Sequence, residues 1–169
     1  MAASLPESAT RVQEHLKSQG CAARVVELPA GTRTAAAAAQ AVGCDVSQIA
    51  KSIVFRAAES GRPVLVVASG SNRVDEAAVA KLLGEPIEKA SPDFVRENTG
   101  YAIGGVPPVA HLRPPVTFID AHLLSLSTIW AAAGTPTTVF ALTPEELVRL
   151  TSGQVASIAQ ETDIGRRGN

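Results

Sequence analysis

Apolar spacing and capping residues predict helices in five parts of the chain. Between Ser8 and Gly20, Val12 and Leu16 stand four positions apart among charged residues, which puts both on one face of a helix. Gly20 follows where a C-cap glycine would end that helix. The other four helices are indicated by alanine content, N-cap residues, prolines at the first helical position and glycines at the end; they cover residues 34–43, 75–84, 91–96 and 143–150.

Short apolar runs between turn residues predict strands. Ser52–Arg56 and Pro63–Ala68 flank the turn residues Glu59-Ser-Gly-Arg62, so these two runs predict a hairpin. Helices and strands mix without a regular βαβ alternation. The predicted class is therefore α+β, with a mixed, largely antiparallel or barrel-like sheet flanked by helices. The remaining predicted strands cover residues 22–28, 115–119, 127–131 and 137–142.

Length and composition indicate one domain. The chain has 169 residues, of which 46% are hydrophobic, and this is enough to bury one sizeable core. We expect a single domain over residues 1–169, with its core at 11–150 and a flexible tail at 161–169. No apolar run approaches the roughly 20 residues of a membrane span, and the first residues lack the features of a secretory signal. We therefore expect a cytoplasmic protein with no membrane partner.

The charge balance and the metal-binding residue types narrow the possible ligands. Fifteen Lys and Arg against sixteen Asp and Glu argue against DNA binding, which depends on neutralising many phosphates. The same balance allows a few placed groups to hold one end of a nucleic acid. Cys21 and Cys44 form no C-x-x-C pair, and the three histidines are scattered, so no metal or other cofactor is expected.

Familiar catalytic signatures are missing from the sequence. There is no H-E-x-x-H, no P-loop and no G-x-S-x-G around Ser69 or Ser71. An enzyme with this sequence would have to rely on backbone groups and on atoms of its substrate. The segment Tyr101–His111 suits that role, because its paired glycines and paired prolines combine a close approach to the backbone with a stiff turn. Lys51, before the predicted strand 52–56, can reach into an adjacent cleft.

Four segments together resemble the YbaK/ProX family of aminoacyl-tRNA deacylases, which are related to the editing domain inserted in bacterial prolyl-tRNA synthetases. They are Ala50-Lys-Ser-Ile-Val-Phe55, Val64-Leu-Val-Val-Ala68, Gly104-Gly-Val-Pro-Pro108 and Val116-Thr-Phe-Ile-Asp120. The resemblance runs from about residue 11 to residue 150. It implies trans editing, which is hydrolysis of the ester that joins a wrong amino acid to the terminal ribose of a tRNA.

The resemblance also implies which residues form the site. The family's G-x-x-P loop, which shapes the aminoacyl pocket, falls on Gly105, Val106, Pro107 and Pro108, with Gly104 beside it. The family's lysine falls on Lys51, which is expected to contact the terminal adenosine or its phosphate. Lys51 and Gly105 are thus the predicted catalytic residues. Family members generally use no protein nucleophile or metal, because a ribose hydroxyl of the substrate orients the water.

Three further residues are candidates for substrate contact. Ser69, at the end of a predicted strand, can line the aminoacyl pocket. His111 can titrate near neutral pH, with a role at the rim of the site as its alternative. Asp120 closes a strand, and its alternative role is to hold a turn.

Val106 and Pro107 in the loop suggest a small, apolar pocket. That favours alanine or 2-aminobutyrate on proline tRNA, with cysteine, serine and threonine close behind. The expected partners of this freestanding protein are the acceptor end of the tRNA and, for delivery, prolyl-tRNA synthetase or an elongation factor. The alternative function is a non-catalytic module that binds a nucleotide or a tRNA end.

Overall fold

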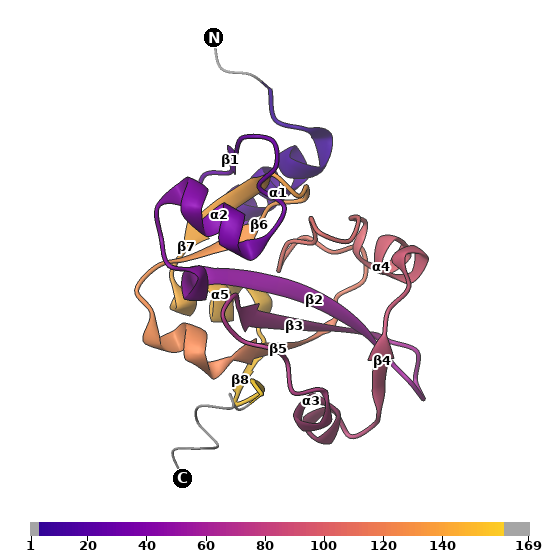
Figure 1. The fold of residues 1–169 in the computed structure, drawn as a ribbon. Coiled ribbons are helices and arrows are strands. Elements are labelled where there is room, and N and C mark those ends of the chain that lie inside the picture. Colours follow the sequence, from indigo (N-terminus) through magenta and orange to yellow (C-terminus); the bar gives the residue numbers. More distant parts are fainter. Residues whose placement is uncertain (1–3, 161–169) are drawn as a thin grey trace.

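The computed structural model describes residues 4–160 (Figure 1), and the tail expected to be flexible at 161–169 lies outside the described residues. The helices are α1 (Glu7–Ser18), α2 (Ala35–Val42), α3 (Glu76–Leu83), α4 (Pro92–Thr99) and α5 (Pro144–Thr151), with short 3-10 helices at Val46–Gln48 and Ala121–Ser125. The strands are β1 (Val26–Glu27), β2 (Ile49–Ala57), β3 (Pro63–Ser69), β4 (Ile87–Lys89), β5 (Val116–Asp120), β6 (Ile129–Ala132), β7 (Thr138–Leu142) and β8 (Gln154–Ala156).

The capping residues set the predicted helix boundaries. The side chains of Thr34, Ser91 and Thr143 accept hydrogen bonds from backbone N–H groups at the starts of α2, α4 and α5. Gly43 and Gly84 end α2 and α3 in the left-handed conformation, which glycine adopts without strain. These predictions are confirmed, whereas α1 ends at Ser18, two residues before the predicted glycine.

All eight strands between residues 4 and 160 belong to one mixed sheet, with the order β1-β7-β6-β2-β3-β5-β8 and β4 paired to β2. The β2–β3, β2–β4, β6–β7 and β1–β7 pairs are antiparallel, and the β2–β6, β3–β5 and β5–β8 pairs are parallel. The mixed α+β class and the predicted β2–β3 hairpin are therefore confirmed. This strand order describes an open path between β1 and β8 rather than a closed barrel.

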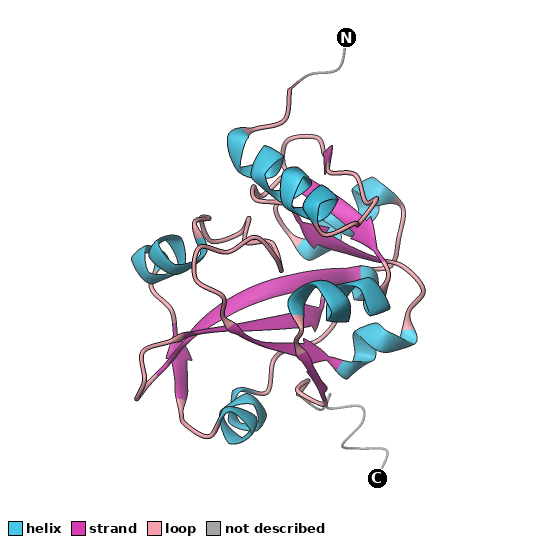
Figure 2. Cartoon of the chain, turned by 180° about the vertical axis from the view of Figure 1, so that it is seen from behind, coloured by secondary structure: helices cyan, strands magenta, loops and turns pink. Residues whose placement is uncertain are grey.

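Helices cover both sides of the sheet (Figure 2). On β3, Leu65 and Val67 pack into the larger core with residues of α1, α4 and α5. Their neighbours Val64 and Val66 pack into a second core with Val79 of α3. Because successive side chains of a strand point to opposite faces, β3 is covered on both sides, and all its residues are buried.

Some predicted strands are shorter in the structure, and two strands were missed. The predicted strand 22–28 is reduced to Val26–Glu27, because Gln13 of α1 bonds the Ala23 carbonyl and the Val25 N–H. The predicted strand 127–131 begins at Ile129, since the Thr128 carbonyl accepts from Gln48. The missed strands β4 and β8 have three residues each, too few for a clear apolar pattern.

Candidate active site

Two cavities meet beside β2, and we call them the large cavity and the small cavity. Their volumes are about 520 Å³ and about 200 Å³. Both are lined by Lys51, Ser52, Gly104 and Val106, so the fold brings the predicted lysine and the first part of the predicted loop together. In Figure 1 the chain after α4 runs back toward β2, which allows this meeting. Residues 53 positions apart in sequence thus share one site.

The open edge of β2 forms the floor where the cavities meet. On the side away from β3, β2 pairs with β6 at Ile49–Ala50 and with β4 at Phe55–Ala57, while residues 51–54 have no strand partner among the described residues. The backbone hydrogen bonds of the Ala57 N–H and the Ile49 carbonyl both run to the β3 side. The backbone N–H and C=O groups of odd-numbered β2 residues therefore point toward β3. The alternation of a strand therefore directs the backbone N–H and C=O of Ser52 toward this open edge.

Lys51 lies inside a strand, as the third residue of β2, and the prediction that it precedes the strand is wrong. Its Nζ donates to the Asn72 carbonyl at 2.9 Å. Burial lowers the pKa of Lys51 and the charge of Arg73 lowers it further, while Asp120 acts in the opposite direction. The ammonium has three N–H groups, so this one hydrogen bond leaves two for a ligand in either cavity.

Asp120 and Ser69 build the support behind the lysine. Asp120 is 2% exposed, and one carboxylate oxygen accepts from the Ser69 N–H at 3.1 Å and from the Asn72 side chain at 2.9 Å. Its other oxygen accepts from the His122 N–H at 3.0 Å. The Ser69 hydroxyl is buried and donates to the Ser47 carbonyl at 2.7 Å. Neither residue lines the large or the small cavity, so their geometry fits the support of Lys51 better than the predicted contact with substrate.

Gly104 and Gly105, the two adjacent glycines of the loop, differ in conformation and in burial. Gly104 has φ +93° and is exposed where the cavities meet. Gly105 is buried, and a Cβ there would lie 2.7 Å from the Thr135 Cα. Its N–H donates to the Ala102 carbonyl at 3.1 Å, and its carbonyl accepts from the Gly134 N–H at 2.9 Å. The close approach at Gly105 is therefore to the protein's own backbone, and its polar groups are already bonded.

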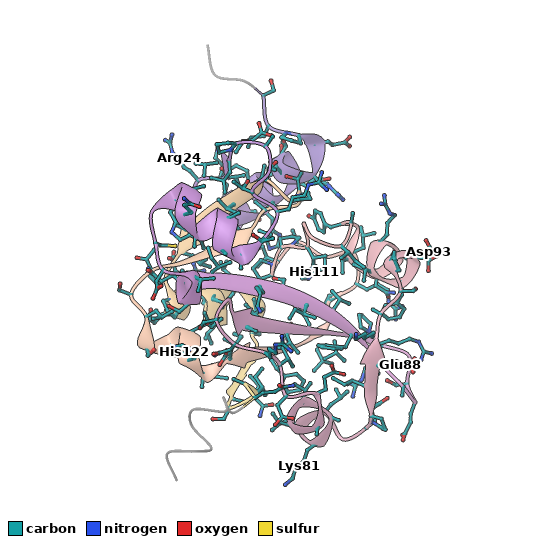
Figure 3. The ribbon with its side chains drawn as sticks, viewed as in Figure 1. Arg24, Lys81, Glu88, Asp93, His111 and His122 are labelled. Carbon is teal, nitrogen blue, oxygen red and sulfur yellow. The ribbon has the colours of Figure 1, made fainter. Side chains whose placement is uncertain are left out.

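After Val106, which lines both cavities, the loop turns away from them. Val106 is 4% exposed and contributes to the larger core. Pro108 and His111 line a third cavity of about 660 Å³, which we call the far cavity. His111 lies on the segment between α4 and β5 (Figure 3), and its Nε2 is 2.7 Å from the Pro107 carbonyl. Burial lowers the pKa of His111, the bond to Pro107 opposes this, and the charge of His15 adds to the lowering.

Two residues at the site were missed from the sequence. The Ser52 hydroxyl is buried and has no hydrogen-bond partner among residues 4–160. Because a buried hydroxyl without a partner is costly, it is a candidate contact for a polar group of a ligand. Its position next to Lys51 is the signal that could have found it. Trp130 lies in a short apolar run, which is typical of a core residue, but it is half-buried and lines the small cavity.

The described residues give no support for a metal or a membrane span. Between residues 4 and 160, no group of three or more His, Cys, Asp or Glu side chains is placed to hold a metal ion. Within the same range no helix is long and apolar enough to cross a membrane.

The chain belongs to the aminoacyl-tRNA editing domain family, whose model matches residues 29–150. The predicted family and the predicted class of enzyme, an aminoacyl-tRNA deacylase, are thereby confirmed. The match contains all of the residues that were predicted to form the site, namely Lys51, Ser69, Gly104, Gly105, Val106, Pro107, Pro108, His111 and Asp120.

Known proteins similar to this chain include an uncharacterized protein and two with assigned activities. Protein YwhH of Bacillus subtilis is 33% identical over 131 residues, which are 78% of this chain and 83% of that protein. The "Putative Cys-tRNA(Pro)/Cys-tRNA(Cys) deacylase EbsC" of Enterococcus faecalis is 29% identical over 74% of this chain and 76% of that protein. A crystal structure of "a putative trans-editing enzyme for prolyl tRNA synthetase" has a TM-score of 0.90 and 50% identity, and the match covers 94% of this chain and 100% of that one.

Proposed function

We propose that this chain is a trans-editing hydrolase that removes a small amino acid from mischarged proline tRNA. The observation that carries the proposal is the meeting of a small and a large cavity at Lys51 and Gly104. A substrate with a small aminoacyl group on a larger nucleotide fits such a pair. The similar proteins support the choice of tRNA, because the names of two of them include tRNA(Pro) or prolyl tRNA synthetase.

The small cavity suits the aminoacyl group. At about 200 Å³ it has room for little more than a short side chain with the ester. Much of its wall is apolar, so it favours alanine or 2-aminobutyrate, with cysteine, serine and threonine as neighbours in size. The apolar residues that line it are Ala35, Ala38, Ile49, Ala50, Val106, Trp130, Ala131, Ala132, Pro136 and Val139.

The large cavity suits the terminal adenosine of the tRNA. Its volume of about 520 Å³ lies within the usual range for small-ligand sites. Arg73 and Lys89 line it together with Lys51, so three cationic side chains are available for a phosphate. Ile103, which is 55% exposed, and Val95 offer apolar surface to the base.

The reaction is the hydrolysis of an ester, in which water attacks the ester carbonyl carbon. The bond between that carbon and the ribose oxygen breaks, the ribose oxygen takes a proton, and the free amino acid and the tRNA leave. We assign Lys51 to the nucleotide, and the Ser52 hydroxyl and backbone to polar atoms of the aminoacyl ester. Gly104 exposes its backbone where the two cavities meet. The hydrogen bond between the Gly105 carbonyl and the Gly134 N–H keeps that backbone in place. Fixed dipoles and one oriented water are enough for an activated ester.

Single-turnover deacylation of a panel of mischarged tRNAs tests the proposal. Proline tRNA carrying alanine should react fastest, and correctly charged proline tRNA should react slowly. Lys51→Ala should lose about 10-fold to 150-fold, as expected for one charge-assisted contact of roughly 1.5–3 kcal/mol. Lys81→Ala is the matched control, because Lys81 is exposed on α3 (Figure 3). A folded wild-type protein that binds these tRNAs without cleaving any of them would favour the non-catalytic binding module.

The proposed substrate sets the remaining expectations. Charged tRNA is used in the cytoplasm, so we propose that the protein works there. The cavities hold only the end of the acceptor, so selection of the tRNA would depend on contacts along the acceptor stem or on delivery by prolyl-tRNA synthetase or an elongation factor. Co-elution of the protein with the synthetase in the presence and absence of tRNA tests delivery by the synthetase.

A further inference from the structure

We propose that His111 is a positioning residue that holds the loop of residues 104–108 in place from outside the active site. The inference rests on the proposed deacylation at the large and small cavities, since it concerns how the loop beside them is held. His111 lines neither of these cavities, so its position suits an action on the loop rather than contact with a substrate bound there. It lines the far cavity, whose lining residues include none of those around the other two.

The hydrogen bond of His111 defines what the residue can do. Its Nε2 lies 2.7 Å from the carbonyl of Pro107, and a carbonyl can only accept. His111 therefore carries a proton on Nε2 and donates it. Pro107 is buried in the middle of the loop, directly after Val106, which lines both active-site cavities. Holding this carbonyl fixes the peptide plane that follows Pro107 and limits the movement of Val106.

The local backbone explains why a side chain, rather than a backbone N–H, is needed to hold the Pro107 carbonyl. Residues 107 and 108 are both prolines, so neither supplies an N–H to close the turn. Ala110 has φ +66°, a left-handed conformation that is uncommon for a residue other than glycine. The Tyr101 hydroxyl donates to the Ala110 carbonyl at 3.1 Å. Two side-chain bonds, from His111 and Tyr101, thus hold a turn in which two successive residues have no backbone donor and a third has a left-handed conformation.

Among residues 4–160, Nε2 of His111 bonds the Pro107 carbonyl and none of the charged or titratable groups that share its cavity. Arg11, Glu14 and His15 of α1 line the same far cavity. Arg11 is engaged elsewhere, because its guanidinium lies 4.7 Å from the Tyr101 ring centroid and donates to the Gly100 carbonyl at 3.0 Å. His15 lines the cavity without bonding the loop, which makes it the matched control.

Three substitutions of His111 test the inference. Glutamine can place its amide N–H where Nε2 stands, whereas asparagine is too short and alanine has no donor. In single-turnover assays we expect His111→Gln to stay within about 3-fold of the wild type. His111→Ala and His111→Asn should lose roughly 10-fold to 100-fold in the rate at saturating protein, because a small misplacement of a reacting group is costly. The half-saturating protein concentration should change little, and His15→Ala should behave like the wild type.

A second measurement does not depend on activity. Nitrogen-15 NMR of the His111 imidazole should show the proton on Nε2 in the neutral ring, and a proton on Nδ1 would overturn the inference. Equal rates for all three variants would also overturn it, while an active wild type would leave the proposed deacylation standing. A wild type that deacylates no substrate of the panel would instead overturn the proposed function, and the tautomer would still report whether His111 holds Pro107.

Discussion

Asp120 and Asn72 are joined by a hydrogen bond of 2.9 Å from the side-chain amide to the carboxylate. The backbone carbonyl of the same Asn72 accepts from the Lys51 ammonium, also at 2.9 Å. A buried carboxylate thus holds the residue that orients the lysine of the site. Asp120 lines neither the large nor the small cavity, and it contributes to the site through Asn72 and through its charge near Lys51.

Asp120→Asn should therefore reduce both stability and activity. The amide keeps the size of the side chain but removes the charge from an acceptor of three hydrogen bonds. Hydrogen bonds to charged groups contribute roughly 1.5–3 kcal/mol each, and we expect a loss of about that size in the free energy of unfolding. Urea unfolding and single-turnover rates measure the two effects. Asp93→Asn, at an exposed position of α4 (Figure 3), should change stability by less than about 0.5 kcal/mol. Unchanged stability in Asp120→Asn would contradict the supporting role.

Binding of the tRNA end should weaken at alkaline pH. Burial and the charge of Arg73 lower the pKa of Lys51 below its usual 10.5. An ammonium is charged only below its pKa, so its contact with a phosphate should begin to weaken before pH 10.5 is reached. Affinity for a non-hydrolysable aminoacyl-tRNA analogue, measured across this range, reports the change. Lys51→Arg keeps its charge and should show no weakening in the same range. Identical pH profiles for the two proteins would mean that Lys51 does not contact the phosphate.

Gly105→Ala should destabilise the loop by a clash within the protein. A methyl group at this position would lie 2.7–2.9 Å from the Thr135 backbone. Overpacking of this kind costs about 1–3 kcal/mol, and the shift of Thr135 should also lower the deacylation rate. Gly104→Ala separates the clash from backbone strain, because Gly104 has φ +93° and its nearest contact would be Pro136 at 3.8 Å. Urea unfolding of both variants measures the difference. A Gly105→Ala protein as stable as the wild type would contradict the contact with Thr135.

Local features of the fold could be predicted from the sequence, and long-range contacts could not. Thr34 and Ser91 act on N–H groups three residues away, so their caps are visible in the sequence. The bond of Lys51 to Asn72 depends on how the turn after β3 folds, which no spacing rule gives. The meeting of Lys51 and Gly104 could be expected only from the resemblance to a known family. The resemblance named Gly105 as catalytic and Gly104 as a substrate contact, and of the two it is Gly104 that is exposed.

Val106→Ala should widen the range of amino acids that the site accepts. Val106 lines the small cavity, and its shortening adds room where we place the aminoacyl side chain. A methylene in an apolar pocket is worth about 1–3 kcal/mol of discrimination, so the rate for valine relative to alanine on proline tRNA should rise roughly 10-fold or more. Loss of buried apolar atoms should also reduce stability by about 1.6 kcal/mol, at about 0.8 kcal/mol for each carbon removed. Val109→Ala is the matched control, because Val109 is equally buried in the same loop but lines the far cavity. It should lose similar stability and keep the wild-type preference. If both variants change preference alike, the effect comes from a loosened loop, and the small cavity is not the aminoacyl pocket.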